Sequence, residues 1–141
     1  MQRTVTLVDE SGLPTGTADL GKAHDGEGML HRAFSAYVFR QAWAEILIQR
    51  RAPGKRLWAG FWANTCCSHP FEHESPAGAA ERRLCEELGL SCALRPVGTL
   101  IYHAIDPSGR GAEHEHVTLL AGQADPATAV HPDPAEVSEY R

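Results

Sequence analysis

Apolar and polar residues alternate along Thr4 to Val8, and this pattern predicts a strand near the start of the chain. The turn-forming residues Pro14 to Gly16 follow it. Lys22 to His31 is polar and contains glycines, so we expect a loop there. Aromatic and β-branched residues then fill Ala33 to Phe39 and Ala44 to Gln49, which indicates a pair of strands.

The strongest helical signal lies in the middle of the chain. Ser75 is a good N-cap, Pro76 suits the first helical position, and Gly89 follows the last periodic residue. We therefore predict a helix over Pro76 to Leu88. Four apolar residues recur at helical spacing and are expected to face the core: Ala77, Ala80, Leu84 and Leu88. Arg83 and Glu87, four residues apart, then share an adjoining face.

The other segments carry loop and strand signals. Arg50 to Trp62 is rich in basic residues and tryptophan, and Asn64 to His73 has no clear period, so both are expected to be loops. Leu94 to Ile105 and Ala112 to Ala121 have the pattern of two strands joined by a turn. The tail from Asp125 carries no obvious element. Together these segments predict one α+β domain over residues 1–141, with a mixed sheet flanked by helices.

Composition narrows the classes of function. With 43% apolar and 22% charged residues, the chain has the balance of a soluble globular protein. Its first ten residues lack the features of a signal peptide, and its four cysteines form no CxxC pair, so we expect a cytoplasmic protein with reduced thiols. The net charge of −5, without a basic run, argues against nucleic acid as a partner, while a small anion needs only a local basic cluster.

Histidines and carboxylates form the first candidate site. Side chains two apart on a strand point the same way, so Glu113 and Glu115 are expected on one face and His114 and His116 on the other. Imidazoles and carboxylates together suit a divalent metal in a roughly octahedral shell. The candidate ligands are His24, His31, His69, Glu113 and Glu115. Solvated surface histidines and an acidic strand edge are the alternative.

Cys67 is the second candidate. It lies in a polar stretch beside Cys66 and close to His69. A cysteine in such a place can act as a thiolate or as a proton donor, because its pKa lies near neutrality and responds to local charge. A buried, inert thiol is the alternative. Cys85, inside the predicted helix, and Cys92, in the turn after it, are assigned to packing.

Basic residues and tryptophans form the third candidate. Trp58 and Trp62 lie at the end of a stretch of cations, and together these residues could form the entrance of a pocket with a cationic rim and apolar walls, here called the cationic mouth. The cations are Arg50, Arg51, Lys55 and Arg56, with Arg83 added from the helix. Such a mouth suits a diphosphate on a short hydrocarbon, although a solvated strand end has the same composition.

The stretch from Ser68 to Leu90 resembles the Nudix box. The matching positions are Glu74, Arg82, Leu84, Glu86, Glu87, Gly89 and Leu90. Ser68 stands where the box opens with glycine, and Arg83 stands where it has a glutamate. Because that glutamate serves metal binding and water activation in Nudix hydrolases, its absence makes hydrolysis of a phosphoanhydride less expected, while the resemblance still implies a Nudix-like fold.

Several separated motifs resemble those of the type I isopentenyl-diphosphate isomerases. They are Trp58-Ala-Gly-Phe-Trp62, Asn64-Thr-Cys-Cys-Ser-His-Pro70, Arg82-Arg-Leu-Cys-Glu-Glu-Leu-Gly89 and Glu113-His-Glu-His116. The resemblance runs from about Thr4 to the last residue, and the motifs agree in order and spacing. It implies isomerisation of isopentenyl diphosphate to dimethylallyl diphosphate.

The resemblance also implies roles for particular residues. One divalent ion, Mg²⁺ or Mn²⁺, is expected on three imidazoles and two carboxylates: His24, His31, His69, Glu113 and Glu115. Glu87 is expected to help hold a second Mg²⁺ on the substrate diphosphate, close to these cations: Arg51, Lys55 and Arg83. Cys67 matches the catalytic cysteine, and Tyr102 with Glu115 matches the proton-handling pair across the substrate. Leu20 occupies the position of a diphosphate-binding lysine, for which Lys22 is the expected replacement.

The family continues beyond the position of Arg141 with a strand and a helical segment that carries a tryptophan over the hydrocarbon end of the substrate. We therefore expect a fold without that segment, an open alkene pocket, and Trp58 or Trp62 as the aromatic wall. The expected partner is a small prenyl diphosphate, bound by a monomer or weak dimer without membrane insertion. A Nudix-type pyrophosphohydrolase and a non-catalytic binding domain are the alternatives.

Overall fold

The computed structural model describes residues 3–141 as ten strands and two helices. The strands are β1 (Thr4–Val8), β2 (Pro14–Asp19), β3 (His31–Arg40), β4 (Glu45–Ile46), β5 (Gln49–Arg51), β6 (Trp62–Ala63), β7 (Cys66–Ser68), β8 (Arg95–Ile105), β9 (Ala112–Gln123) and β10 (Val137–Tyr140). The helices are α1 (Leu20–Ala23) and α2 (Pro76–Leu88). None of the helices in the described residues is long and apolar enough to cross a bilayer.

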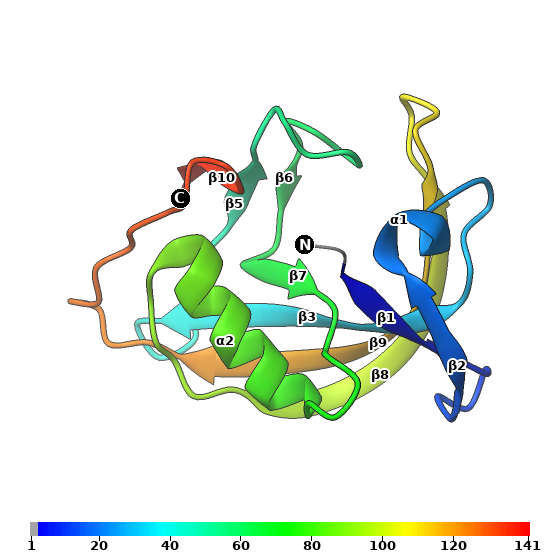
Figure 1. The fold of residues 1–141 in the computed structure, drawn as a ribbon. Helices are drawn as coiled ribbons and strands as arrows, with labels where there is room; N and C mark the ends of the chain where they lie inside the picture. The colour runs from blue at the N-terminus through cyan, green and yellow to red at the C-terminus, as the bar shows by residue number, and fades with distance from the viewer. Residues whose placement is uncertain (1–2) are drawn as a thin grey trace.

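A mixed sheet forms the centre of the fold. Its main path runs β2-β1-β3-β9-β8, and β4 and β7 also pair with β3. The β3 and β9 pair is parallel and the other pairs in this sheet are antiparallel. A second sheet, β10-β5-β6, lies above the central sheet in the view of Figure 1. The α+β class with a mixed sheet is confirmed.

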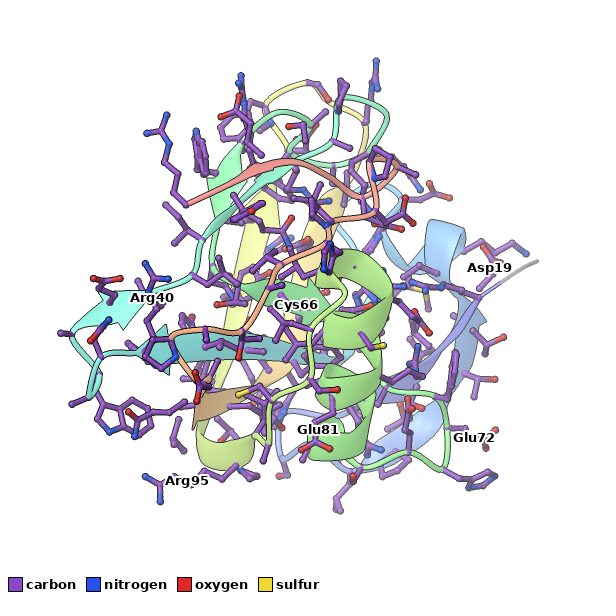
Figure 2. All side chains as sticks on the ribbon, turned by 90° about the vertical axis from the view of Figure 1, so that its left-hand side faces the viewer. Asp19, Arg40, Cys66, Glu72, Glu81 and Arg95 are labelled. Carbon is purple, nitrogen blue, oxygen red and sulfur yellow. The ribbon has the colours of Figure 1, made fainter. Side chains whose placement is uncertain are left out.

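Helix α2 covers one face of the central sheet (Figure 1). Leu84 and Leu88 of α2 are fully buried against Phe34 of β3 and Leu120 of β9. Cys66 of β7 belongs to this core and lies beside the helix in Figure 2. Because side chains alternate along a strand, the neighbours of these residues point to the opposite face of the sheet, where the candidate site lies.

The predicted ends of α2 are confirmed. The Ser75 hydroxyl accepts a hydrogen bond from the Gly78 backbone N–H at 3.0 Å, as an N-cap does. Gly89 ends the helix in the left-handed conformation, with φ of 62°. A Cβ atom at position 89 would lie 2.7 Å from the carbonyl oxygen of His131. The C-terminal end of α2 therefore requires glycine.

Replacing Gly89 should weaken the fold. We expect Gly89→Ala to lower the free energy of unfolding by about 1–2 kcal/mol, because an L-residue is strained in this conformation and its Cβ meets the His131 carbonyl. Thermal unfolding would measure the change. Gly16→Ala is the control, since a Cβ there meets no atom within 4 Å and φ is not positive. An unchanged melting temperature for Gly89→Ala would contradict this account.

Three expectations about local structure were wrong. Pro14 to Gly16 belongs to β2, because an edge strand tolerates proline. The expected loop over Asn64 to His73 contains β7, which pairs with β3, and the tail beyond Asp125 contains β10, which pairs with β5. Two boundaries also shift. The loop predicted from Lys22 to His31 begins inside α1, and the strand predicted over Ala44 to Gln49 is divided between β4 and β5.

Candidate active site

Three neighbouring strands place polar side chains in a row on the face of the central sheet opposite α2. His31 of β3 lies opposite Glu115 of β9, and Glu115 lies opposite Tyr102 of β8. Strand alternation puts Glu113 on the same face as Glu115, as predicted. Two further histidines reach this face from outside the row: His24 caps α1 and His69 follows β7.

Three imidazoles converge on one carboxylate oxygen. The Oε2 atom of Glu115 lies 3.8 Å from Nε2 of His24, 3.0 Å from Nε2 of His31 and 2.8 Å from Nε2 of His69. The four ligand atoms lie within 4.8 Å of one another. The fold therefore brings four of the five predicted ligands into a compact group that fits a metal ion.

The hydrogen bonds of His31 and His24 show where a cation can bind. The carbonyl oxygen of Met29 lies 2.7 Å from Nδ1 of His31, so Nδ1 must carry the proton that is donated. In the neutral ring, Nε2 then directs a lone pair at the Glu115 oxygen, which has no proton to donate when ionised. Nε2 of His24 is buried and has no hydrogen-bond partner among residues 3–141. A bound metal ion would take the place of a proton between Nε2 of His31 and Glu115, and it would also give the buried nitrogen of His24 a partner.

The pKa values follow from this arrangement. Burial opposes ionisation of Glu115, but the three neighbouring imidazoles, two of them (His31 and His69) within hydrogen-bond distance, hold its pKa well below the usual value. Burial alone would lower the pKa of His31, yet the hydrogen bond and charge of Glu115 leave it raised. Burial lowers the pKa of His69, which favours the neutral imidazole that binds metals.

Glu113 lies next to this group and is joined to it through Tyr102. The Tyr102 hydroxyl donates to Oε2 of Glu113 and also lies 2.9 Å from Oε1 of Glu115. One phenolic proton is thus shared by two carboxylates. Burial and the charge of Glu115 raise the pKa of Glu113, and burial with both carboxylates raises the pKa of Tyr102. The phenol is neutral here, and the carboxylate pair favours a nearby cation.

Cys67 reaches the same face from β7. Its sulfur lies 2.9 Å from Oδ1 of Asn64 and 3.4 Å from the Ser35 hydroxyl. The Asn64 amide nitrogen donates to two backbone carbonyls, of Ala36 and Cys66, so its oxygen must face the thiol. Although the side chain is open to the cavity, the surrounding protein raises the pKa of the Cys67 thiol to about 11 by desolvation.

Two adjoining cavities lie over these residues. A cavity of about 220 Å³ is bordered by Glu115, His69 and several cations. Its cations are Arg3, Arg51, Lys55, Arg56 and Arg83. The second cavity, of about 190 Å³, is bordered by aromatic side chains. These are Trp58, Phe61, Trp62 and Tyr102.

Three residues border both cavities: Arg51, Cys67 and Glu113. They stand where the cationic region meets the aromatic region. A ligand with an anionic head and a short apolar tail would therefore place its head among the cations and its tail between the tryptophans, with the thiol and the carboxylates at the junction.

Arg83 and Glu87 share a buried face of α2, as predicted. The Arg83 guanidinium lies 3.6 Å from Oε1 of Glu87 and 2.6 Å from Oε2 of Glu86. The Cys66 thiol donates to Oε2 of Glu87 at 2.8 Å, and burial raises the pKa values of both groups. Arg83 borders the cationic cavity, whereas Glu87 lies behind it.

The remaining predicted residues divide into two groups. Arg56 reaches the cavity, but its guanidinium is taken up by hydrogen bonds to Gly21, Asp25 and Arg110. Lys22 is exposed on α1 and does not border either cavity, so the expected replacement of the family's lysine has no support in the structure. Arg50 turns away from the cavity and pairs with Glu139 at 3.3 Å.

Sequence reasoning missed Arg3, Asn64 and Glu136. Arg3 borders the cationic cavity from the start of the chain, and Asn64 orients Cys67. Glu136 pairs with two of the cavity's cations. Arg3 and Glu136 have no local signal, because each acts on residues distant in sequence. Asn64 is only three residues from Cys67, and its place in the Asn64-Thr-Cys-Cys-Ser-His-Pro70 motif is the signal that could have identified it.

Comparisons with known proteins agree with this geometry. The NUDIX domain family matches residues 29–141. A Nocardia farcinica protein named isopentenyl-diphosphate Delta-isomerase is 45% identical over 137 residues, 97% of this chain and 77% of that protein. A Streptomyces griseus protein of the same name is 48% identical over 134 residues, 94% of this chain and 66% of that protein. A third, from Burkholderia multivorans, is 43% identical over the whole chain and 77% of that protein.

Solved structures with the same fold include more distant proteins. A crystal structure from Deinococcus radiodurans has a TM-score of 0.75 at 17% identity and covers 99% of this chain and 82% of that one. The NUDIX domain of Shewanella oneidensis NrtR, solved with ADP ribose, has a TM-score of 0.61 at 18% identity and covers 85% and 74%. These identities establish the fold alone. The NUDIX match and the relatives at 43–48% identity together place this chain in the NUDIX family, among the isopentenyl-diphosphate Delta-isomerases.

Proposed function

We propose that this protein isomerises isopentenyl diphosphate to dimethylallyl diphosphate. The observation that carries the proposal is the junction of the two cavities, where Cys67 and Glu113 border both the cationic and the aromatic region. A bound diphosphate in the cationic region would leave the five-carbon tail at this junction. The names of the similar proteins support the same substrate.

The reaction needs one proton delivered to the alkene and another removed from a neighbouring carbon. We assign one transfer to the Cys67 thiol and the other to the Tyr102 and Glu115 pair, in which the phenol lies 2.9 Å from the carboxylate. Both groups belong to the same face of the central sheet, so they can act on one substrate. Trp58 and Trp62 supply apolar walls that exclude water and aromatic faces that favour a developing cation.

We propose a divalent ion, Mg²⁺ or Mn²⁺, on His24, His31, His69 and Glu115, with Glu113 as a further ligand. When bound, such an ion fixes the Glu115 carboxylate and increases the acidity of groups that contact it. We further propose that a second Mg²⁺ enters with the diphosphate and that Glu87 helps to hold it. Glu87 lies 3.6 Å from Arg83, which borders the cationic cavity, and this contact supports the role.

The substrate is thus a small prenyl diphosphate, and we propose action in the cytoplasm by a monomer or weak dimer. The four cysteines are free thiols in the structure, which suits a reducing compartment.

Proton NMR in deuterated water tests the function directly. Isopentenyl diphosphate with Mg²⁺ and this protein should yield dimethylallyl diphosphate with deuterium incorporated. Release of inorganic phosphate or pyrophosphate without isomerisation would instead favour a Nudix-type hydrolase. An unchanged spectrum, with binding retained, would leave a non-catalytic binding domain and refute the proposal.

Arg51 offers a sharp test of the cationic cavity. Its Nε donates to the Leu57 carbonyl at 2.9 Å, which leaves the rest of the guanidinium to face both cavities. We expect Arg51→Met to raise KM by about tenfold or more, because a charge-assisted hydrogen bond to the diphosphate is lost. Arg50→Met is the matched control, since Arg50 borders neither cavity and pairs with Glu139. Equal KM values for the two variants would exclude a diphosphate contact by Arg51.

A further inference from the structure

Glu136 lies just before β10 and is fixed there by the backbone. Its carbonyl oxygen accepts from the Ala52 N–H at 2.9 Å, and its own N–H donates to the Asp133 carbonyl at 2.9 Å. The next residue, Val137, is paired with Arg51 of β5. The position of this carboxylate relative to the β5 end of the cationic cavity is therefore set by the three-stranded sheet.

One carboxylate joins two cations that come from different elements. Oε2 of Glu136 lies 2.5 Å from the ammonium of Lys55, in the β5–β6 connection. Its Oε1 lies 3.6 Å from the guanidinium of Arg83, on α2. Both cations border the cavity of about 220 Å³, whereas Glu136 does not. The carboxylate thus contacts them from behind.

This arrangement orders both cations and leaves Lys55 with protons that can contact a ligand. Arg83 is also held by Glu86 and Glu87, and its Nε atom is buried without a hydrogen-bond partner among residues 3–141. Lys55 has no other ion pair in the described residues, so two of its three ammonium protons stay available. A free lysine side chain samples many rotamers, and ordering it before a ligand arrives lowers the entropic cost of binding.

We infer that Glu136 is a positioning residue, which holds Lys55 and Arg83 together at the cationic cavity as the pair of cations that receives a magnesium-bound diphosphate. This inference rests on the proposed function, because it specifies how that site receives the head of its substrate. Glu136 touches neither the substrate nor the reacting carbons. Its effect belongs to binding, so it should appear in KM and hardly in kcat.

The test compares Glu136→Gln with Glu139→Gln in the full chain. Glutamine keeps the size of the side chain at position 136 but loses the charge that holds both cations. Glu139 is the matched control, because it lies on β10, pairs with Arg50 at 3.3 Å and borders neither cavity. The measurements are the Kd of pyrophosphate with Mg²⁺ by calorimetry, KM and kcat by NMR, and the melting temperature.

We expect Glu136→Gln to raise the Kd of magnesium pyrophosphate and the KM by about fivefold or more, with kcat within about twofold. Glu139→Gln should match the parent protein. In a Lys55→Met background the effect of Glu136→Gln should mostly disappear, because one of the two cations that it positions is already absent. A general loss of structure would not depend on Lys55 in this way.

Several results would overturn the inference. Unchanged pyrophosphate affinity in Glu136→Gln would mean that the carboxylate does not position the cations, and tighter binding would mean that it competes with the ligand. If Glu136→Gln were unfolded, Glu136→Asp would decide, since a shortened carboxylate that cannot reach both cations should weaken binding and a full parental affinity would refute the idea. Pyrophosphate binding is independent of turnover. A parent protein that binds it without isomerising the substrate would therefore refute the proposed function and leave this inference standing.

Discussion

Cys67→Ala is expected to lower the rate of isomerisation by about 10²–10⁴-fold, the usual contribution of a general acid or base. The thiol lies at the junction of the two cavities, held by Asn64, and no other cysteine borders either cavity. Since the sulfur is not among the four atoms that converge near Glu115, metal content should stay at the parental level. NMR turnover and elemental analysis of the same sample would measure both.

Cys66→Ala is the matched control for this experiment. The two cysteines are neighbours on β7, so their side chains point to opposite faces of the sheet. Cys66 lies in the core against α2 and donates to Glu87, so its removal should cost about 1 kcal/mol of stability and leave most of the turnover. If Cys66 were essential and Cys67 dispensable, the assignment of the catalytic thiol would be wrong.

The elements that the sequence predicted have local causes. Helix α2 follows from Ser75, Pro76 and Gly89, which define its ends within a few residues, and from apolar positions at helical spacing. Strands β3, β8 and β9 are long enough to be predicted from their composition. Alternation along β9 also placed Glu113 and Glu115 on one face before any partner strand was known.

The elements that were missed depend on partners elsewhere in the chain. Strand β7 has only three residues, Cys66 to Ser68, and they are extended because Phe34 to Ala36 of β3 pairs with them. Strand β10 forms against β5 in the same way. Short strands of this kind carry no period, since pairing and not composition decides their conformation.

The candidate site divides in the same manner. The resemblance to the isomerase family identified His24, His31 and His69, which come from separate segments, as ligands of one ion. Composition and periodicity alone could not distinguish such a site from scattered surface histidines. The position of Glu136 behind Lys55 and Arg83 has no signal in the sequence, because it arises from the pairing of β10 with β5. Lys22 was selected for its closeness in sequence to Leu20, but helix α1 turns it to solvent while Leu20 borders the cavity.

Removing one ligand of the histidine and glutamate group should release metal and abolish turnover together. We expect His31→Ala and Glu115→Gln each to lose the ion during gel filtration and to reduce turnover by about a hundredfold or more, because three of the four ligand atoms converge on Glu115. His114→Ala is the matched control. His114 lies between Glu113 and Glu115 on β9, but its ring stacks on His103, with the centroids 4.7 Å apart, on the opposite face.

Acidification should imitate these substitutions. Imidazole binds a metal only when it is neutral, so metal content should fall as the pH drops into the range where the histidines protonate, beginning with His31, whose pKa is raised. The low pKa of Glu115 means that this carboxylate stays ionised over the same range, so the loss would come from the histidines. Equilibrium dialysis with Mn²⁺ between pH 5 and 8 would measure it, with His114→Ala as the reference at every pH. Two results would contradict this assignment: a parental amount of metal in His31→Ala, or metal binding that does not change with pH. In either case the ion would be bound elsewhere, and the converging imidazoles would have a structural role only.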